Sequence, residues 1–345
     1  MEAERTLTKG ELNRALLARQ LLLERAHVPL PRALEQVAGL QAQYAPSMYI
    51  GLWCRLEDFE REELTRALQQ RTVVQGTLMR LTIHLVSAGD YRYFAAAIGD
   101  ARRRLWLRTR SEHLDQEDME AAALELRPRL AHGPLRRKEM DEIIGKARAS
   151  GVGLWLDLVR VPPSGTWERR RADLYAAADD WLRATEKTKE EGLEHLVRRY
   201  LAGFGPATKG EIADWSGLAV RDVVSVLERL ELRHFSDERG QKLLDVPGAP
   251  LPDPDTPAPV RFLPVWDATL LVHARRTGIL PEEYRPLVFN TRTPHSVNTF
   301  LVDGAVAGTW RYEKGEVKME PFAKLDEATW RALRDEAEGL VALHA

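Results

Sequence analysis

The order of the predicted elements constrains this chain most: short helices followed by a strand pair occur three times in the first 247 residues. Apolar residues recur at helical spacing and then give way to β-branched residues in period two. Helices that end in a two-stranded hairpin are typical of the winged helix. Strand pairs are expected at 71–87, 151–163 and 235–245. Helices are expected at 12–25, 32–40, 60–69, 117–130, 135–146, 171–183, 191–201, 211–215 and 220–230.

A proline-rich segment separates these units from the rest of the chain. Six prolines fall within 247–259, which predicts a linker at 248–259. Short β-rich runs follow, with tight-turn dipeptides at Asp303-Gly304 and Lys314-Gly315, and a helix is expected at 327–343. The expected fold is α+β, with tandem winged-helix units followed by a small C-terminal β-barrel-like domain. The expected boundaries are 1–115, 116–188, 189–247 and 260–345.

Composition is that of a globular protein, with 44% hydrophobic residues, 30% charged residues and a formal net charge of −2. A membrane span needs ~18 consecutive apolar residues, which the sequence does not contain. The charged start, Met1 to Arg5, does not resemble a secretory signal. The single cysteine, Cys54, excludes an internal disulfide and argues against structural zinc. We therefore expect a cytoplasmic protein without a metal, a cofactor or a membrane partner.

Arginine residues cluster in three places, although the net charge gives no general sign of nucleic-acid binding. Each cluster is either a local anion-binding face or a solvated helix face paired with Asp and Glu. The clusters are Arg102, Arg103, Arg104, Arg108 and Arg110; Arg169, Arg170 and Arg171; and Arg275 and Arg276.

Gln41 and Gln43 are the best candidates for chemistry. They lie two residues apart at the expected end of a helix, just before a turn at Pro46. Each amide offers both a donor and an acceptor, so the pair would hold a water against the C1′ atom of a sugar. Their carbonyl oxygens would stabilise the oxocarbenium character that builds as a base leaves. Neutral amides suit a base that is already cationic, such as an N-alkylated purine. Outside such a context, two amides of this kind are simply surface residues.

Four stretches of sequence carry a resemblance to a known family. They are residues 37–56 around the glutamines, residues 76–86, residues 205–208 with 214–218, and residues 300–304 with 307–311. Together they resemble the AlkZ/YcaQ-type winged-helix DNA glycosylases, in the Gln-x-Gln form. The resemblance implies tandem winged helices with a C-terminal barrel, and monofunctional glycosylase activity on alkylated purines and, in some members, interstrand crosslinks. It also implies that Gln41 and Gln43 are catalytic.

Other residues are candidates for contact with double-stranded DNA. Arg80 and His84 are expected on one strand, facing the same side by period two, where they would contact phosphate. His84 is equally well explained as a satisfied histidine on a strand. Arg275 and Arg276 precede Gly278 and are expected in a loop or hairpin edge that contacts the DNA backbone or groove. The glutamine motif contains no lysine for a Schiff base, so we expect no lyase activity.

Two other classes of protein stay open. Winged helices serve transcriptional regulators more often than enzymes. A regulator should carry basic and amide residues on its recognition helix, but the helix expected at 220–230 also carries Asp222 and Glu228 beside Arg221 and Arg229. The near-neutral charge also fits a protein-interaction module. A monomer is expected in each case.

Overall fold

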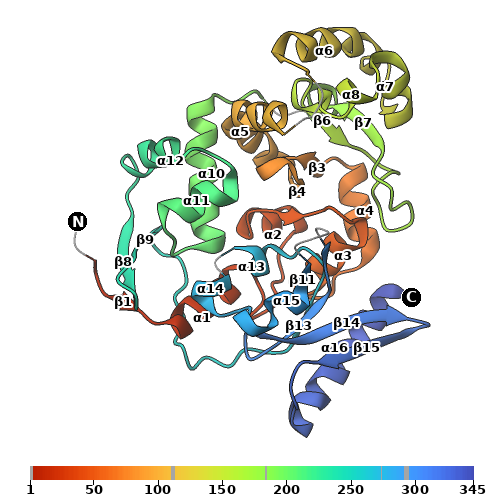
Figure 1. Cartoon of the computed structure of the whole chain (residues 1–345). Helices are drawn as coiled ribbons and strands as arrows, with labels where there is room; N and C mark the ends of the chain where they lie inside the picture. Colours follow the sequence, from red (N-terminus) through yellow and green to blue (C-terminus); the bar gives the residue numbers. More distant parts are fainter. Residues whose placement is uncertain (1–2, 110–112, 183–184, 273, 291–294) are drawn as a thin grey trace.

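The computed structural model describes residues 3–109, 113–182, 185–272, 274–290 and 295–345. As expected, it is a mixed α+β structure, and its described strands form four sheets. Figure 1 shows the C-terminal segment beside the N-terminal helices, far from the helices near residue 130. No helix in the described ranges is long and apolar enough to span a bilayer.

Four helices precede the first strand pair. They are α1 (Lys9–Arg19), α2 (Leu30–Gln36), α3 (Ala45–Trp53) and α4 (Arg61–Gln69). The strand pair itself is confirmed as β3 (Val73–Thr77) and β4 (Ile83–Ser87), joined by the 3-10 turn η1 (Met79–Leu81). The sequence pattern does not predict α3, because Pro46 was interpreted as a turn residue. Pro46 lies instead in the first turn of this helix, where its missing N–H leaves no hydrogen bond unmade.

The strand pair expected at 151–163 is wrong, because only one strand lies there and it pairs with residues 73–77 and 174–177 in one six-stranded sheet. The strands β2 (Leu40–Gln41), β5 (Leu135–Arg136), β6 (Leu158–Arg160) and β7 (Leu174–Ala177) join β3 and β4 in the order β2-β4-β3-β6-β7-β5, with every pair antiparallel. The helix expected at 171–183 is therefore wrong for most of its length. Residues 174–177 pair with β6, and only α9 (Ala178–Trp181) is helical.

The long helix α5 (Ala88–Arg108) follows β4 directly, and the Ser87 hydroxyl caps it by accepting the Asp90 N–H at 3.0 Å. The second unit continues with α6 (Gln116–Leu130), α7 (Arg137–Ile144), α8 (Lys146–Ala149) and η2 (Val152–Leu154). Buried residues of these elements form a hydrophobic cluster of their own, together with Trp106 of α5.

The third unit follows the expected order most closely. It contains α10 (Lys189–Phe204), α11 (Lys209–Ser216), α12 (Val220–Leu227), β8 (Arg233–Asp237) and β9 (Lys242–Asp245), and β1 (Thr6–Leu7) pairs parallel with β8. Thr208 and Glu211 form a capping box at the start of α11. Gly217 ends α11 in the left-handed conformation, at a φ of 76°.

The C-terminal strands form an open sheet instead of a barrel. β10 (Arg261–Leu263), β13 (Thr299–Val302), β14 (Ala305–Glu313) and β15 (Glu316–Pro321) lie in that order, all antiparallel, and α16 (Glu327–His344) ends the chain. In the described ranges β10 and β15 stay unpaired edges, because four short strands are too few to close. The other elements are α13 (Ala268–Leu271), α14 (Ala274–Thr277), η3 (Glu282–Tyr284), α15 (Arg285–Val288), β11 (Phe289–Asn290) and β12 (His295–Ser296).

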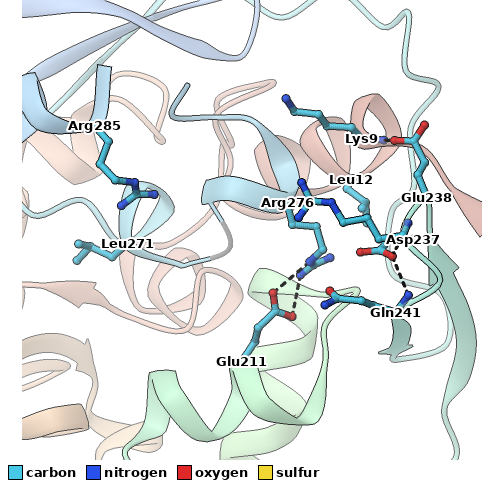
Figure 2. Close-up of a pocket in the computed structure, with 10 residues that line it drawn as sticks. Lys9, Leu12, Glu211, Asp237, Glu238, Gln241, Leu271, Arg276 and Arg285 are labelled. Carbon is cyan, nitrogen blue, oxygen red and sulfur yellow. Dashed lines mark hydrogen bonds and ion pairs between the residues drawn. The ribbon is translucent and has the colours of Figure 1, made fainter. Parts of the chain in front are cut away.

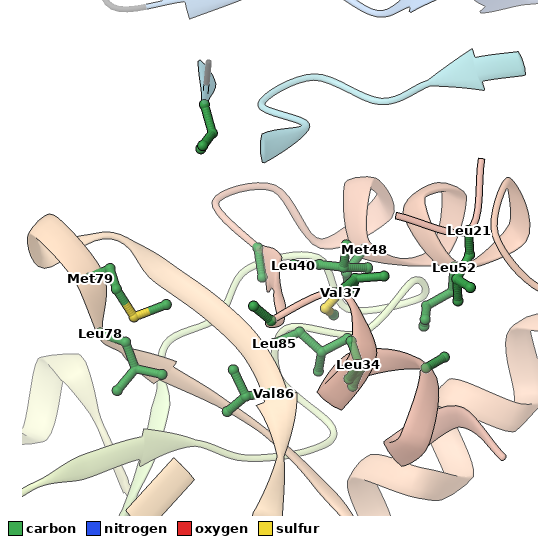
Figure 3. Close-up of a cluster of buried hydrophobic side chains, with 14 of the residues drawn as sticks. Leu21, Leu34, Val37, Leu40, Met48, Leu52, Leu78, Met79, Leu85 and Val86 are labelled. Atoms are coloured by element: carbon green, nitrogen blue, oxygen red, sulfur yellow. The ribbon is translucent and has the colours of Figure 1, made fainter. Parts of the chain in front are cut away.

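One hydrophobic cluster extends from α1 to α16 and includes the contacts beneath β2 and β4. Figure 3 shows Leu34, Leu40 and Leu85 gathered in this cluster. All three side chains are buried, so α2, β2 and β4 share one apolar interior.

A buried ion pair links the first helix to the third unit. Both Nη atoms of Arg19 donate to the Asp245 carboxylate, at 2.7 and 2.8 Å, and both side chains are fully buried. The same guanidinium donates to the carbonyl oxygens of Leu201 and Pro250, each at 3.0 Å. One side chain thereby connects α1, α10, β9 and the proline-rich segment.

We predict that Arg19→Met lowers the free energy of unfolding by about 3–5 kcal/mol, because the buried Asp245 carboxylate loses its cation. Urea denaturation measures the change. The double variant Arg19→Met with Asp245→Leu should recover part of the loss, since neither charge then stays buried alone. Unchanged stability of the single variant would contradict this role.

Candidate active site

The two glutamines lie on an edge strand and its extension, and not at a helix end as expected. Helix α2 ends at Gln36, the chain turns through Gly39 at a φ of 83°, and β2 begins at Leu40. A Cβ at Gly39 would lie 2.7 Å from Val86 Cγ1, so a glycine permits β2 to approach β4. Gln41 then pairs with His84 across the ladder.

The ladder continues beyond β2 and fixes Gln43. The Ala42 N–H donates to the Ile83 carbonyl at 2.7 Å, and the Gln43 side-chain oxygen accepts the Ile83 N–H at 3.2 Å. Side chains alternate along extended chain, so Gln41 and Gln43 lie on the same side of it. Gln43 is exposed and Gln41 is half-buried. In the described part of the chain, Gln41 makes no side-chain hydrogen bond.

His84 lies opposite Gln41 and is 4% exposed. Its Nδ1 is 3.1 Å from the Thr82 carbonyl oxygen, which only accepts, so Nδ1 carries the proton. Burial, with a smaller contribution from the charge of Arg80, lowers the pKa of His84 to about 4. The ring is therefore neutral at physiological pH.

The sequence pattern predicts Arg80 on the same strand as His84, but this prediction is wrong. Arg80 lies in η1 at a φ of 51°, and β4 begins three residues later. Its Nη1 donates to the Trp215 carbonyl at 2.7 Å, and burial lowers the pKa of its guanidinium. Arg80 is thus tied to the C-terminal end of α11.

Arg276 lies in the short helix α14, where a loop or hairpin edge was expected. Both carboxylate oxygens of Glu211 accept from Arg276 at 3.1 Å, and Pro206 accepts at 2.7 Å (Figure 2). Arg276 and Arg80 line adjoining hollows of about 550 and 340 Å³, which share Glu211 and Leu271. The side chain of Arg275 lies outside the described part of the chain.

The structure adds an aromatic and a basic residue beside Gln43. Tyr44 is 44% exposed, and its hydroxyl accepts from Arg170 Nη1 at 2.9 Å. Trp167 of the same loop packs edge-on against Tyr49 of α3, with ring centroids 5.6 Å apart. The arginine cluster at 169–171 hints at a basic loop, but no local signal pairs residues 126 positions apart.

Comparisons with known proteins identify the family and the fold of the chain. A family model described as AlkZ-like DNA glycosylase matches residues 34–343, so the chain belongs to that family and the resemblance seen in the sequence is confirmed. Among solved structures, the DNA glycosylase AlkZ of Streptomyces sahachiroi is similar, with a TM-score of 0.82 and 16% sequence identity. The alignment covers 98% of this chain and 97% of that one, and shows a shared fold. No curated protein sequence gives a significant match.

We predict that His84 makes the free energy of unfolding depend on pH, so that the protein is less stable in acid. Between its ordinary pKa of 6.5 and its folded pKa of about 4, the unfolded state binds a proton that the folded state excludes. The unfolding free energy of the wild type, minus that of His84→Asn, should therefore fall by on the order of 2 kcal/mol from pH 6.5 to pH 4. Urea titrations at several pH values measure it. A constant difference would show that the ring ionises equally easily in both states.

Proposed function

We propose that the chain is a monofunctional DNA glycosylase that hydrolyses the N-glycosidic bond of alkylated purines, of the N7-alkylguanine type, in double-stranded DNA. The observation that carries the proposal is the pair of neutral amides on one side of an extended segment, with Gln43 held by the Ile83 N–H. Membership of a glycosylase family supports the reaction class.

Gln41 and Gln43 would act on a water molecule. Its oxygen attacks C1′ while the bond from C1′ to the purine nitrogen breaks, and the bonding electrons neutralise the cationic base. One proton passes from the attacking water to solvent, since neutral amides are too weakly basic to keep it. The amide oxygens orient the water and stabilise the oxocarbenium character. The Ile83 N–H uses one of the two lone pairs of the Gln43 oxygen, and the second can accept from the water.

An open site suits a bulky lesion. Gln43 and Tyr44 are both exposed, so one side of the site faces solvent. We extend the proposal to interstrand crosslinks through alkylated purines, since these cannot enter an enclosed pocket. A transcriptional regulator is the alternative. It would bind DNA without releasing a base, which the next experiment tests.

We predict that purified protein releases the base from duplex DNA that carries N7-methylguanine. Gln41→Ala and Gln43→Ala should each reduce the single-turnover rate by about 100-fold or more, because each removes an amide that stabilises the transition state. DNA binding should persist in both variants. The matched control is Gln69→Ala, which removes an exposed amide from α4 and should leave the rate unchanged.

Two results would overturn parts of this proposal. If wild type binds DNA but releases nothing from either N7-methylguanine or a nitrogen-mustard crosslink, the protein is better explained as a regulator. If activity survives both glutamine substitutions, the enzyme stands but the site is wrong.

We further predict that the product is an intact strand with an abasic site. The motif from Gln41 to Gln43 offers no amine to form a Schiff base with the sugar. Denaturing gels should show a break only after alkali treatment. A nicked strand without alkali would contradict a monofunctional enzyme.

A further inference from the structure

A groove lies between α5 and the turn that joins α11 to α12. Its volume is about 560 Å³, and its walls include Arg104, Arg108 and Arg221, with Leu218 on its apolar side. Of the described residues that line it, none is acidic. We call this feature the arginine groove. It is a concave surface that carries three cations and no acidic lining residue among those described.

The structure divides the first arginine cluster of the sequence into two groups. Arg102 is buried and donates to Asp157 at 2.7 Å, and Arg103 donates to the Leu154 carbonyl at 3.1 Å. These two arginines hold α5 against the second unit. Arg104 and Arg108 are exposed, lie one turn apart on α5, and have no carboxylate partner among the residues that the structure describes.

Arg221 faces this pair from the other wall. It lies in the first turn of α12, and its side chain is 87% exposed. Its nearest carboxylate is that of its neighbour Asp222, at 3.6 Å, outside hydrogen-bonding distance. All three guanidinium groups are therefore available to an anion.

The groove lies against the turn η1, which leads into β4. The turn η1 contacts both α5 and α11. A Cβ at Gly217, which lines the groove, would lie 3.5 Å from the backbone nitrogen of Arg80. Three residues beyond Arg80, the Ile83 N–H holds Gln43. The turn η1 and the start of β4 therefore connect the groove to Gln43.

We infer that the arginine groove binds the phosphodiester backbone of the duplex whose damaged base lies at Gln41 and Gln43. This inference rests on the proposed function. Duplex DNA carries a charge for every ~1.7 Å of its axis, so a strand beside the glutamines needs cations nearby. Arg80 and Arg276 donate hydrogen bonds to carbonyl or carboxylate groups of the protein, whereas the groove arginines are exposed and only Arg221 lies near a described carboxylate, that of Asp222 at 3.6 Å. The groove carries no sequence-reading role, because phosphate contacts position DNA without specifying its bases.

The test compares the triple variant Arg104→Ala, Arg108→Ala and Arg221→Ala with wild type. Binding to an undamaged 20-base-pair duplex is measured over a range of salt concentrations. Each lost phosphate contact lowers the slope of log K against log salt by about 0.9, so we expect a slope smaller by about 2 to 3 and weaker binding by at least about 10-fold at low salt. Thermal unfolding should be unchanged, since all three side chains are exposed.

A matched control removes the same charge elsewhere. Arg127 and Arg129 on α6 and Arg331 on α16 are exposed, and their triple alanine variant should keep the wild-type slope and affinity. An equal loss in both triple variants would reveal only a general charge effect and overturn the groove. An unchanged slope in the groove variant would also overturn the inference, because the groove would then not bind the DNA backbone.

Base release separates this inference from the proposed function. At protein concentrations well below saturation, the groove variant should release N7-methylguanine more slowly than wild type, in proportion to its weaker binding of the duplex. If wild type releases no base yet the groove variant loses salt-dependent binding, the glycosylase proposal fails and the DNA-binding groove stands. If wild type releases base and the groove variant binds normally, the groove fails alone.

Discussion

The pairing of β2 with β4 is the constraint on which the candidate site depends. Two residues of β2 suffice, because β4 is already held on its other edge by β3, and the first of them, Leu40, is buried with Leu85. A shift of one residue would turn Leu40 outward and both glutamines into the interior. The register that buries one leucine therefore also presents two amides to solvent. The approach of these strands in turn requires glycine at position 39.

Some arginines of this chain form buried ion pairs within the fold, and others are exposed at the surface. The net charge reveals neither group. The 50 basic residues nearly balance the 52 acidic ones. Arg19, Arg55 and Arg102 lie in the interior, each bound to an aspartate of a distant segment, so much of the positive charge is used within the fold. A local DNA-binding surface then needs only a few arginines that lack such partners. The net charge of −2 is thus compatible with binding a polyanion at one groove.

The sequence predicted elements whose signals are local and missed those that depend on distant partners. The turns at Gly304 and Gly315 are fixed by neighbouring residues, and both agree with the structure. The strand at 174–177 depends on β6, so helical spacing misled the prediction there. The glutamines were expected at the end of a helix, but Gln41 lies on the edge strand β2 and Gln43 on its extension. Their attachment to Ile83, forty residues away, has no signature in the sequence around them.

The reaction proposed for the candidate site disfavours a free positive charge close to the glutamines. A cationic purine is a good leaving group because departure neutralises it, but a nearby free guanidinium would repel it before the bond breaks. His84, opposite Gln41, has a pKa of about 4 and is neutral, Arg80 points to the end of α11, and the guanidinium of Arg170 donates to the Tyr44 hydroxyl. The exposed arginines of the arginine groove would attract phosphate without facing the base. A carboxylate in place of either amide would bind the cationic base more tightly in the ground state as well. Neutral amides therefore favour the transition state over the bound substrate.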